Sequence, residues 1–521
     1  MYSFAKVFPV IVCGILALAG CAPPQYEISL IHPYREGRPF EECSIDLGFY
    51  KPVQQRPGQD PNIVLVVAAS GGGYRAANFA AGALLGLEEI QSRYLPAGNV
   101  LSEVDYFSSV SGGGFAVGAY FSTLLDYRRF NGTTKGYSFA AAIAPTTSAC
   151  PCKHSPPPQQ KSDPCVRRHL QGLYSDFIGD FLRTLLPWNH LGFDDRNLRF
   201  EKAIDDDTLS YRWRRKKLES LQDPNADKNA ALTLADVFVR ADDPGRQVVM
   251  PYWFANAAVY QNAVIFPFSP EHLRLYEATG YYHRGRKKIC EHNCPDLNDF
   301  ALNTPLSLAV ASSANFPIAM PPLRFASKMD ANNRYFYLFD GGIADNLGVI
   351  TAFRLLEDKI NENALARVLI VIDSYQGGLI PFTEEKKAPS EARTAVRIME
   401  TGLDSWRTRY REVINRLCEQ KNIKPIYISF DDLVDADFND LCPFGLNEQD
   451  KNDLLAHKPR GCPKATPFYI ARSISMTSPV FWGPKGLEYR IPDSQQNLLI
   501  AAGRYVVSKK QGEILAALGW N

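Results

Sequence analysis

The segment Asn62-Ile-Val-Leu-Val-Val-Ala-Ala-Ser-Gly-Gly-Gly-Tyr-Arg75 gives the clearest indication of how this chain folds. Residues 63–69 form a continuous apolar run rich in β-branched side chains, which is typical of a strand buried on both faces of a parallel sheet. A glycine-rich turn follows the run, and residues 76–90 then have helical periodicity. A strand, a glycine turn and a helix in this order predict the first unit of an α/β sheet.

The same order of strand, turn and helix returns further along the chain. A strand-like segment at 104–108 is followed by Ser111-Gly-Gly-Gly114 and by a helical stretch that continues through Leu125. Further strand-like segments lie at 335–339, 367–372 and 424–430. Strands that alternate with helices predict an α/β sheet with helices on both faces.

The chain has 521 residues, which is enough for one large core with insertions or for two domains. We expect a tether over residues 22–60, a main α/β domain over 61–380, and an α/β extension over 381–521 that packs on this domain. Residues 130–245 break the alternation with clustered cysteines and prolines, and we predict that they form an insertion. The charged run 212–217 within it is expected to be a solvated helix face, with contact to lipid headgroups as the alternative.

The overall charge excludes one large class of partners. Hydrophobic residues make up 45% of the chain and charged residues 22%, and the net charge is +1, as in an ordinary globular protein. Because the balance is so near neutral and no basic patch is visible, we predict no nucleic-acid partner.

The N-terminus has the organisation of an export signal. Lys6 precedes an apolar run over residues 7–19, which is shorter than the roughly 20 residues that a membrane-spanning helix needs. The run ends in Leu18-Ala-Gly-Cys21, which resembles a bacterial lipobox and implies cleavage before Cys21 and lipidation of its thiol. Since Ala22 rather than an aspartate follows, we expect an outer-membrane lipoprotein that faces the periplasm. A plain secretory signal is the alternative.

Export also changes the interpretation of the eleven cysteines. Nine remain when Cys13 and Cys21 are set aside, and an oxidising compartment favours disulfides that staple loop-rich insertions, with one thiol left over. Metal binding is the alternative, since segments 152–154 and 290–294 mix cysteine with histidine. The second segment has the pattern C-x-H-x-C, which is not a standard zinc spacing. We therefore predict no metal site and no cofactor.

Ser111 is the candidate nucleophile. A serine must present an exposed Oγ and needs a base to take its proton. In the G-x-S-x-G elbow a strained strand-to-helix turn exposes the hydroxyl, and small neighbours prevent clashes. Here Ser109 takes the place of the first glycine, while Gly113 keeps the second. The pattern alone is degenerate, but its position between a strand and a helix is the one that the motif requires.

The glycine turn is the candidate anion-binding loop. Three successive residues form it: Gly71, Gly72 and Gly73. Their backbone N–H groups are expected to bind an oxyanion, and Arg75 to hold the loop or to bind a substrate phosphate. A simple tight turn is one alternative, and a dinucleotide site of the form G-x-G-x-x-A is another. The dinucleotide site also requires an acidic residue at the end of the next strand, whereas Glu88 and Glu89 lie in the following helix.

An aspartate is the candidate base. None of the eight histidines lies beside a predicted strand end with a compelling partner. Asp340 ends a strand-like segment, and Gly341 and Gly342 after it permit close approach of the chain. Desolvation can make such a carboxylate basic enough to deprotonate a serine. Asp373, at the end of another strand-like segment, is the second candidate, and a simple turn is the structural alternative for Asp-Gly-Gly.

Together these segments resemble those of patatin-like phospholipases and group IV cytosolic phospholipases. Those proteins share a Gly-Gly-Gly-x-Arg loop, a G-x-S-x-G elbow and an Asp-Gly-Gly or Asp-Gly-Ala segment. The block Ala311-Ser-Ser-Ala-Asn-Phe-Pro317 is also similar to a small-residue block of that family. The resemblance covers roughly residues 60–380 outside the insertion. It implies a three-layer α/β/α sandwich with a central, mostly parallel sheet.

The resemblance also implies roles for these residues. Ser111 would be the nucleophile, Asp340 the base, Gly72 and Gly73 the oxyanion donors, and Arg75 a supporting residue. The expected activity is hydrolysis of acyl esters in membrane phospholipids or lysophospholipids, without a metal or cofactor. Two alternatives remain: acyl transfer by the same residues, and a catalytically silent fold that serves as a scaffold or lipid-binding module.

Overall fold

The computed structural model describes residues 45–143, 232–374 and 407–520, apart from short gaps within these ranges, and a small hairpin of β1 (Tyr34–Arg35) and β2 (Arg38–Pro39). The predicted signal segment with Cys21, the charged run 212–217 and six of the other nine cysteines (43, 150, 152, 165, 290 and 294) lie outside the described residues.

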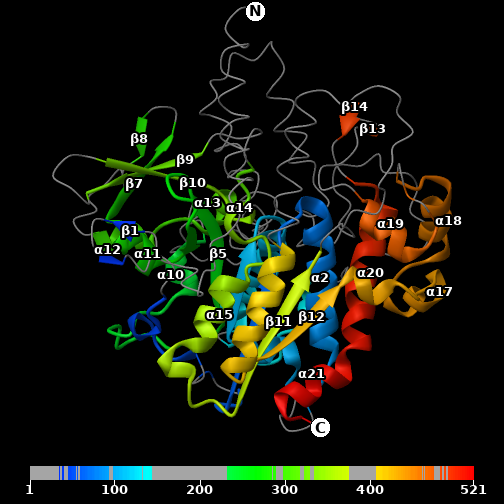
Figure 1. Ribbon diagram of the computed structural model, residues 1–521, viewed down its shortest axis with the longest axis horizontal. Helices are drawn as coiled ribbons and strands as arrows, with labels where there is room; N and C mark the ends of the chain where they lie inside the picture. Colours follow the sequence, from blue (N-terminus) through cyan, green and yellow to red (C-terminus); the bar gives the residue numbers. More distant parts are fainter. Residues whose placement is uncertain are drawn as a thin grey trace, which may run out of the picture.

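A ten-stranded sheet runs through the molecule, and five adjacent strands of it are parallel. Their order is β12 (Lys424–Ser429), β11 (Ala366–Asp373), β3 (Ile63–Ala69), β4 (Tyr106–Val110) and β5 (Tyr252–Val259). Every residue of β3, β4 and β5 is buried, as the continuous apolar run in β3 predicts. Figure 1 shows these strands rising side by side, so that their carboxyl ends share one edge of the sheet.

The rest of the sheet is antiparallel, a feature that the sequence analysis did not predict. After β5 come β10 (Arg334–Asp340), β9 (Leu323–Ser327), β7 (Ala278–His283) and β8 (Arg286–Lys288), and β6 (Ile265–Phe268) also pairs with β5. In β10 the burial alternates from one residue to the next, which is typical of an antiparallel strand with one covered face.

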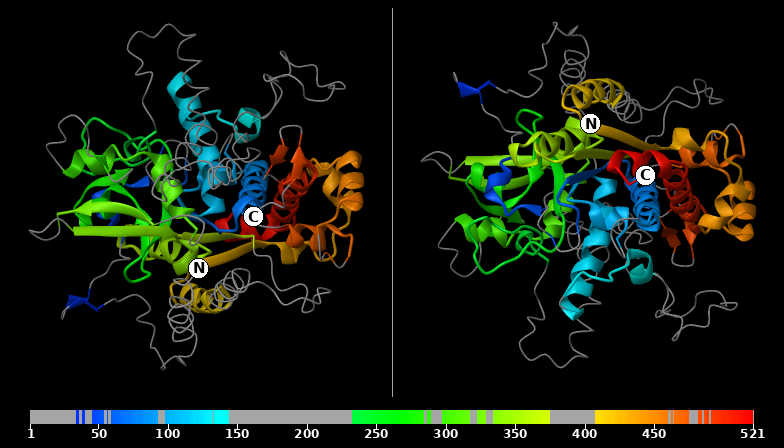
Figure 2. Two further views of the ribbon diagram at one scale, coloured as in Figure 1. Left: turned by 90° about the horizontal axis from the view of Figure 1, so that it is seen from above. Right: turned by 90° about the horizontal axis from the view of Figure 1, so that it is seen from below.

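Helices cover both faces of the sheet (Figure 2). One layer contains α2 (Gly73–Glu89), with α4 (Gly112–Asn131) and α20 (Asp493–Lys509) both packed on it. On the other face lie α15 (Val349–Glu357), which packs on β3, β4 and β11, and a helix over 407–420. This arrangement confirms the predicted α/β/α sandwich around a central sheet.

The C-terminal part of the chain belongs to the same core. Strand β12 is one edge of the main sheet, and α20 lies directly against α2. The two helices approach so closely that a Cβ on Gly82 would collide with the carbonyl of Ile500, and a Cβ on Gly503 with that of Phe79. Because glycine is needed on both sides, this crossing is specified in sequence by residues far apart in the chain.

Shorter elements connect these layers. They are η1 (Leu47–Phe49), α3 (Val100–Glu103), α5 (Phe139–Ile143), α10 (Leu234–Val237), α11 (Pro270–Leu275), α12 (Leu297–Leu302), α13 (Leu306–Ser313), α14 (Gly342–Asp345), η5 (Lys359–Asn361), η6 (Phe430–Leu433), α17 (Phe438–Leu441), η7 (Cys442–Phe444), α18 (Glu448–Ala456), α19 (Pro467–Ser473), β13 (Phe481–Gly483), β14 (Gly486–Glu488) and α21 (Gln511–Leu518). Among the helices that the structure describes, none is both long and apolar enough to cross a membrane.

The described ends of the predicted insertion pack on the main domain. The backbone N–H of Lys51 donates to the carbonyl of Val239 at 3.0 Å. At the other end, the Glu88 carboxylate accepts the N–H groups of Phe139 and Ala140 at 2.5 and 2.7 Å and so caps α5. Residues 139–143 and 232–241 are therefore integrated with the domain on either side of the stretch outside the described residues.

Three cysteines near the C-terminus, for which the sequence favoured disulfides, are free thiols in the structure: Cys418, Cys442 and Cys462. Cys418 is fully buried in the apolar core, where a small thiol packs as a hydrophobic group. Its burial raises its pKa to about 12, so that it is an unreactive thiol at neutral pH.

Candidate active site

Ser111 stands at a strained turn between β4 and α4. Its φ angle is 47°, a left-handed conformation that is uncommon for residues other than glycine. Two of the following glycines allow the turn to sit against the glycine loop. A Cβ on Gly112 would collide with the backbone of Gly73, and one on Gly113 with the carbonyl of Ala69. The geometry is that of the elbow that the sequence suggested, and it brings the elbow into contact with the glycine loop.

Side chains from other elements hold the elbow. The backbone N–H of Ser111 donates to Oγ of Ser313, at the end of α13, at 2.9 Å. Ser109, which replaces the first glycine of the motif, is fully buried, and its Oγ accepts a hydrogen bond from Nε1 of Trp253 at 2.8 Å. The substitution of glycine by serine is therefore accommodated, because the hydroxyl has room and a partner.

A buried polar network lies behind the elbow and was not found by sequence reasoning. Nδ2 of Asn256 donates to Oγ of Ser108 at 2.9 Å and to the carbonyl of Ser109 at 3.1 Å. Oδ1 of Asn256 accepts from the Thr351 hydroxyl at 2.6 Å, while Ser108 donates to the carbonyl of Gly348 at 2.6 Å. Because each of these bonds is buried, the network fixes β4, β5 and the start of α15 relative to one another.

Asp340 lies at the carboxyl end of β10 and is only 4% exposed. Its Oδ1 accepts the N–H of Gly342 at 2.7 Å, and the Ser111 hydroxyl lies within hydrogen-bonding reach of the carboxylate. Burial raises the pKa of Asp340 to about 6, although these two donors lower it again in part. The carboxylate is thus more basic than an exposed aspartate and is still ionised at neutral pH.

The turn after Asp340 is also closely packed. The N–H of Asp340 donates to the carbonyl of Asn315 at 3.0 Å, and the N–H of Gly341 to that of Ser313 at 3.2 Å. A Cβ on Gly341 would collide with the carbonyl of Asn256. The end of α13 and the residues that follow it therefore contact both the elbow and the aspartate turn. Ser313 and Asn315 belong to the small-residue block that the sequence showed, so part of this block lies at the site.

The glycine loop presents two backbone donors rather than three. The N–H of Gly71 donates to the carbonyl of Asn346 at 2.9 Å and is therefore committed within the protein. Gly72, with φ of 139°, precedes the first turn of α2, and Gly73 begins this helix. Among the residues that the structure describes, no acceptor binds the N–H groups of Gly72 and Gly73. Two donors at the start of a 17-residue helix make a site for negative charge beside Ser111.

Arg75 holds the loop in place. It is 2% exposed, its Nε donates to the carbonyl of Ser374 at 2.9 Å, and its guanidinium also donates to the carbonyl of Ile474 at 2.8 Å. The Ser374 hydroxyl in turn donates to the carbonyl of Gly71 at 3.1 Å. Of the two roles considered for Arg75, these contacts favour support of the loop over binding of a substrate phosphate.

The other candidate residues have different partners. Asp373 forms a buried ion pair with Arg407, which leaves Asp340 as the carboxylate beside Ser111. Neither glutamate of a dinucleotide site is available, since Glu88 caps α5 and Glu89 pairs with Arg504. In the described part of the chain, no group of three or more His, Cys, Asp or Glu side chains is placed to hold a metal ion.

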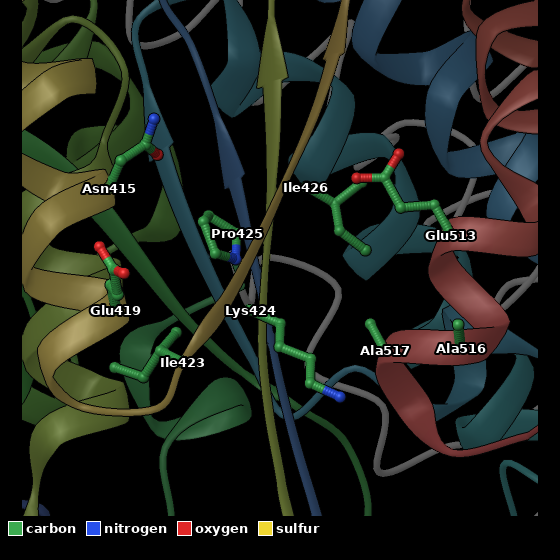
Figure 3. A pocket seen from close by; sticks show the side chains of 9 residues that line it. All are labelled: Asn415, Glu419, Ile423, Lys424, Pro425, Ile426, Glu513, Ala516 and Ala517. Atoms are coloured by element: carbon green, nitrogen blue, oxygen red, sulfur yellow. The ribbon is translucent and has the colours of Figure 1, made fainter.

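A cavity of about 500 Å³ lies at the other end of the sheet (Figure 3). It is lined by the start of β12, by the helix over 407–420 and by α21, with Glu419 and Glu513 on its two sides. Ser111 and the glycine loop follow the carboxyl ends of β4 and β3, whereas this cavity adjoins the amino end of β12. It is therefore separate from the serine site.

Comparisons with known proteins identify the family. No curated protein matches the chain. Among solved structures, human GIVD cytosolic phospholipase A2 aligns with 88% of this chain and 60% of its own, at 12% sequence identity and a TM-score of 0.34. The family model of patatin-like phospholipases matches residues 67–353, more than half of the chain and a range that includes Ser111 and Asp340. The chain belongs to the patatin-like phospholipase family.

Proposed function

We propose that this protein is a serine acyl hydrolase of membrane lipids, with Ser111 as nucleophile and Asp340 as base. One observation carries the proposal: the hydroxyl of a serine at φ 47° lies within reach of a buried carboxylate whose pKa is about 6. Membership of the patatin-like phospholipase family supports a lipid hydrolase in general. The residue pair supports the more specific mechanism.

The first half of the reaction forms an acyl-enzyme. Asp340 takes the proton of the Ser111 hydroxyl while Oγ attacks the carbonyl carbon of an ester. The carbonyl oxygen becomes negatively charged, and the N–H groups of Gly72 and Gly73 stabilise it. Asp340 then gives its proton to the departing alcohol, so that the carboxylate is regenerated and the acyl group remains on Ser111.

The second half of the reaction releases the acyl group. A water molecule gives a proton to Asp340 and attacks the acyl-enzyme through the same oxyanion, and Ser111 leaves with the proton. The product is a fatty acid. If another alcohol takes the place of water, the same residues carry out acyl transfer, so that the accepting molecule decides between the two reactions.

We place the enzyme at a membrane. The expected lipidation of Cys21 would hold the domain beside phospholipids or lysophospholipids in the outer membrane, with residues 22–60 as a tether. The near-neutral charge fits neither a nucleic-acid partner nor a strongly basic membrane patch. The lipid class and acyl position depend on the pocket above Ser111, and a panel of esters is needed to define them.

A fluorophosphonate tests the proposal directly, because it forms a covalent adduct only with an activated serine. The full chain in detergent and its Ser111→Ala variant are treated with the reagent, and the adduct is measured by intact mass. We expect one adduct on the parent and none on the variant, together with release of fatty acid from phospholipid vesicles by the parent alone. A folded parent that forms no adduct, with or without vesicles, would instead support a scaffold or lipid-binding role.

A further inference from the structure

We propose that the side-chain amide of Asn346 is a third donor to the oxyanion, an inference that rests on the proposed function of Ser111. Asn346 directly follows α14, six residues after Asp340. Its side chain is partly exposed. No motif in the sequence analysis singled it out, and its position at the site became visible only in the tertiary structure.

The Asn346 carboxamide lies against both glycine turns of the site. A Cβ on Gly71 would collide with Oδ1 of Asn346, and one on Gly342 would be 2.8 Å from the same oxygen. The position of a Gly71 Cβ is also only 3.3 Å from Cβ of Ser111. Since residue 71 is a glycine, the carboxamide occupies space beside Ser111 that a side chain at position 71 would otherwise fill.

A main-chain hydrogen bond holds Asn346 beside the glycine loop, whereas its side chain has no hydrogen-bond partner among the described residues. Its carbonyl accepts the N–H of Gly71 at 2.9 Å, so the residue is tied to the glycine loop whatever its side chain is. Within the described residues, the carboxamide makes no hydrogen bond with the protein. By contrast, the buried Asn256 uses both ends of its amide. A polar group that is held beside a reactive serine without a protein partner can bind the reacting ester.

The chemistry fits an oxyanion donor. Because the N–H of Gly71 is bound to the carbonyl of Asn346, only the N–H groups of Gly72 and Gly73 in the glycine loop are available to an oxyanion. The NH₂ group of an asparagine is a further donor of the kind that oxyanion holes use. Rotation about the Cβ–Cγ bond exchanges Oδ1 and Nδ2, so the nitrogen reaches the same positions as the oxygen. The amide would bind the negative oxygen that forms when Ser111 attacks, and it would release this oxygen when the carbonyl is restored.

Two substitutions of similar size test this role, Asn346→Leu and Asn346→Asp, in the full chain in detergent. The readouts are kinact and KI for a fluorophosphonate, measured from pH 5 to pH 9, and thermal unfolding as a check of folding. For Asn346→Leu we expect kinact to fall roughly 10²-fold with little change in KI, as for the loss of an oxyanion donor.

Asn346→Asp should in addition move the pH profile. A Cβ placed on Gly342 would lie 2.8 Å from Oδ1 of Asn346 and 3.0 Å from Oδ1 of Asp340, so these two side chains are close neighbours. A second carboxylate so close disfavours ionisation of Asp340, and we expect the midpoint of the kinact profile to rise by about one pH unit. Asn415→Asp is the matched control, because it adds the same charge at the other end of the sheet and should leave the midpoint unchanged.

The outcomes separate this inference from the proposed function. If the parent reacts and both Asn346 variants react as fast with the same pH midpoint, the inference is overturned and the role of Ser111 stands. The inference is also overturned if Asn346→Leu has a low kinact but Asn346→Asp keeps the parent's pH midpoint, because the side chain of residue 346 would then act away from Asp340. A parent that does not react overturns both.

Discussion

Replacement of Asp340 by asparagine should abolish acylation and yet stabilise the fold at neutral pH. The carboxylate is 4% exposed, and burial raises its pKa from 3.8 to about 6. A group with a raised folded-state pKa contributes stability below its unfolded pKa and loses it as the pH rises through the folded value. At neutral pH the folded protein therefore contains a charged group that is more stable in the unfolded chain.

The magnitude follows from the two pKa values. The cost of ionising Asp340 in the folded state is about 1 kcal/mol at pH 4.5 and about 3 kcal/mol at pH 7.5. The neutral carboxamide of the Asp340→Asn variant would have no such cost, and its oxygen can still accept the N–H of Gly342. We thus expect Asp340→Asn to exceed the parent in unfolding free energy by an amount that grows from about pH 4 and levels off above about pH 7.

Denaturant unfolding at pH 4.5 and pH 7.5, followed by tryptophan fluorescence, measures this difference. Asp373→Asn is the control, since it removes the carboxylate from the buried pair with Arg407 and should lower stability at pH 7.5. In parallel, the acylation rate of the parent should rise through a midpoint near pH 6 and then level off. The prediction is wrong if Asp340→Asn is less stable than the parent at pH 7.5, or if its gain in unfolding free energy is the same at both pH values.

Three further predictions address the elbow, a second buried carboxyl and the N-terminus. Ser111 has φ of 47°, so Ser111→Gly should be more stable than Ser111→Ala by up to about 1 kcal/mol in denaturant unfolding, and equal stability would argue against strain at the elbow. Burial raises the pKa of Glu271 to about 8, so the stability of Glu271→Gln relative to the parent should rise from pH 5 to pH 8 and then level off. A flat difference over that range in thermal unfolding would contradict this. Cys21→Ser should prevent labelling by radioactive palmitate and move the protein from the membrane fraction to the periplasmic fraction, whereas unchanged fractionation would exclude lipidation as the anchor.

The sequence alone was enough to predict the type of fold and the order of its chemical groups. The apolar run at 63–69 has no polar face and is rich in β-branched residues, so it indicated a strand covered on both sides, and the glycines after it indicated a turn into a helix. The same local signals located Ser111 between a strand and a helix, and Asp340 at a strand end. Such signals are readable because they depend on neighbours within a few residues.

Only the tertiary structure brought these groups together. Ser111 follows β4 and Asp340 ends β10, and these strands are separated in the sheet by β5. Because β10 runs antiparallel to β5, its last residue lies at the edge of the sheet where β4 ends, beside the serine. The same packing committed the Gly71 N–H to Asn346 and placed Ser313 behind the elbow.

None of these contacts has a local signature, because each joins residues that are distant in the chain and close only in the packed core. The pKa of Asp340 likewise depends on burial by those distant elements rather than on the Asp-Gly-Gly sequence. Local sequence patterns were enough to identify Ser111, Asp340 and the glycine loop as candidate groups of the site, but not Asn346 or Ser313. Which of these groups lie close together depends on the folded chain, because the distances between side chains and the desolvation of Asp340 arise only in the assembled sheet.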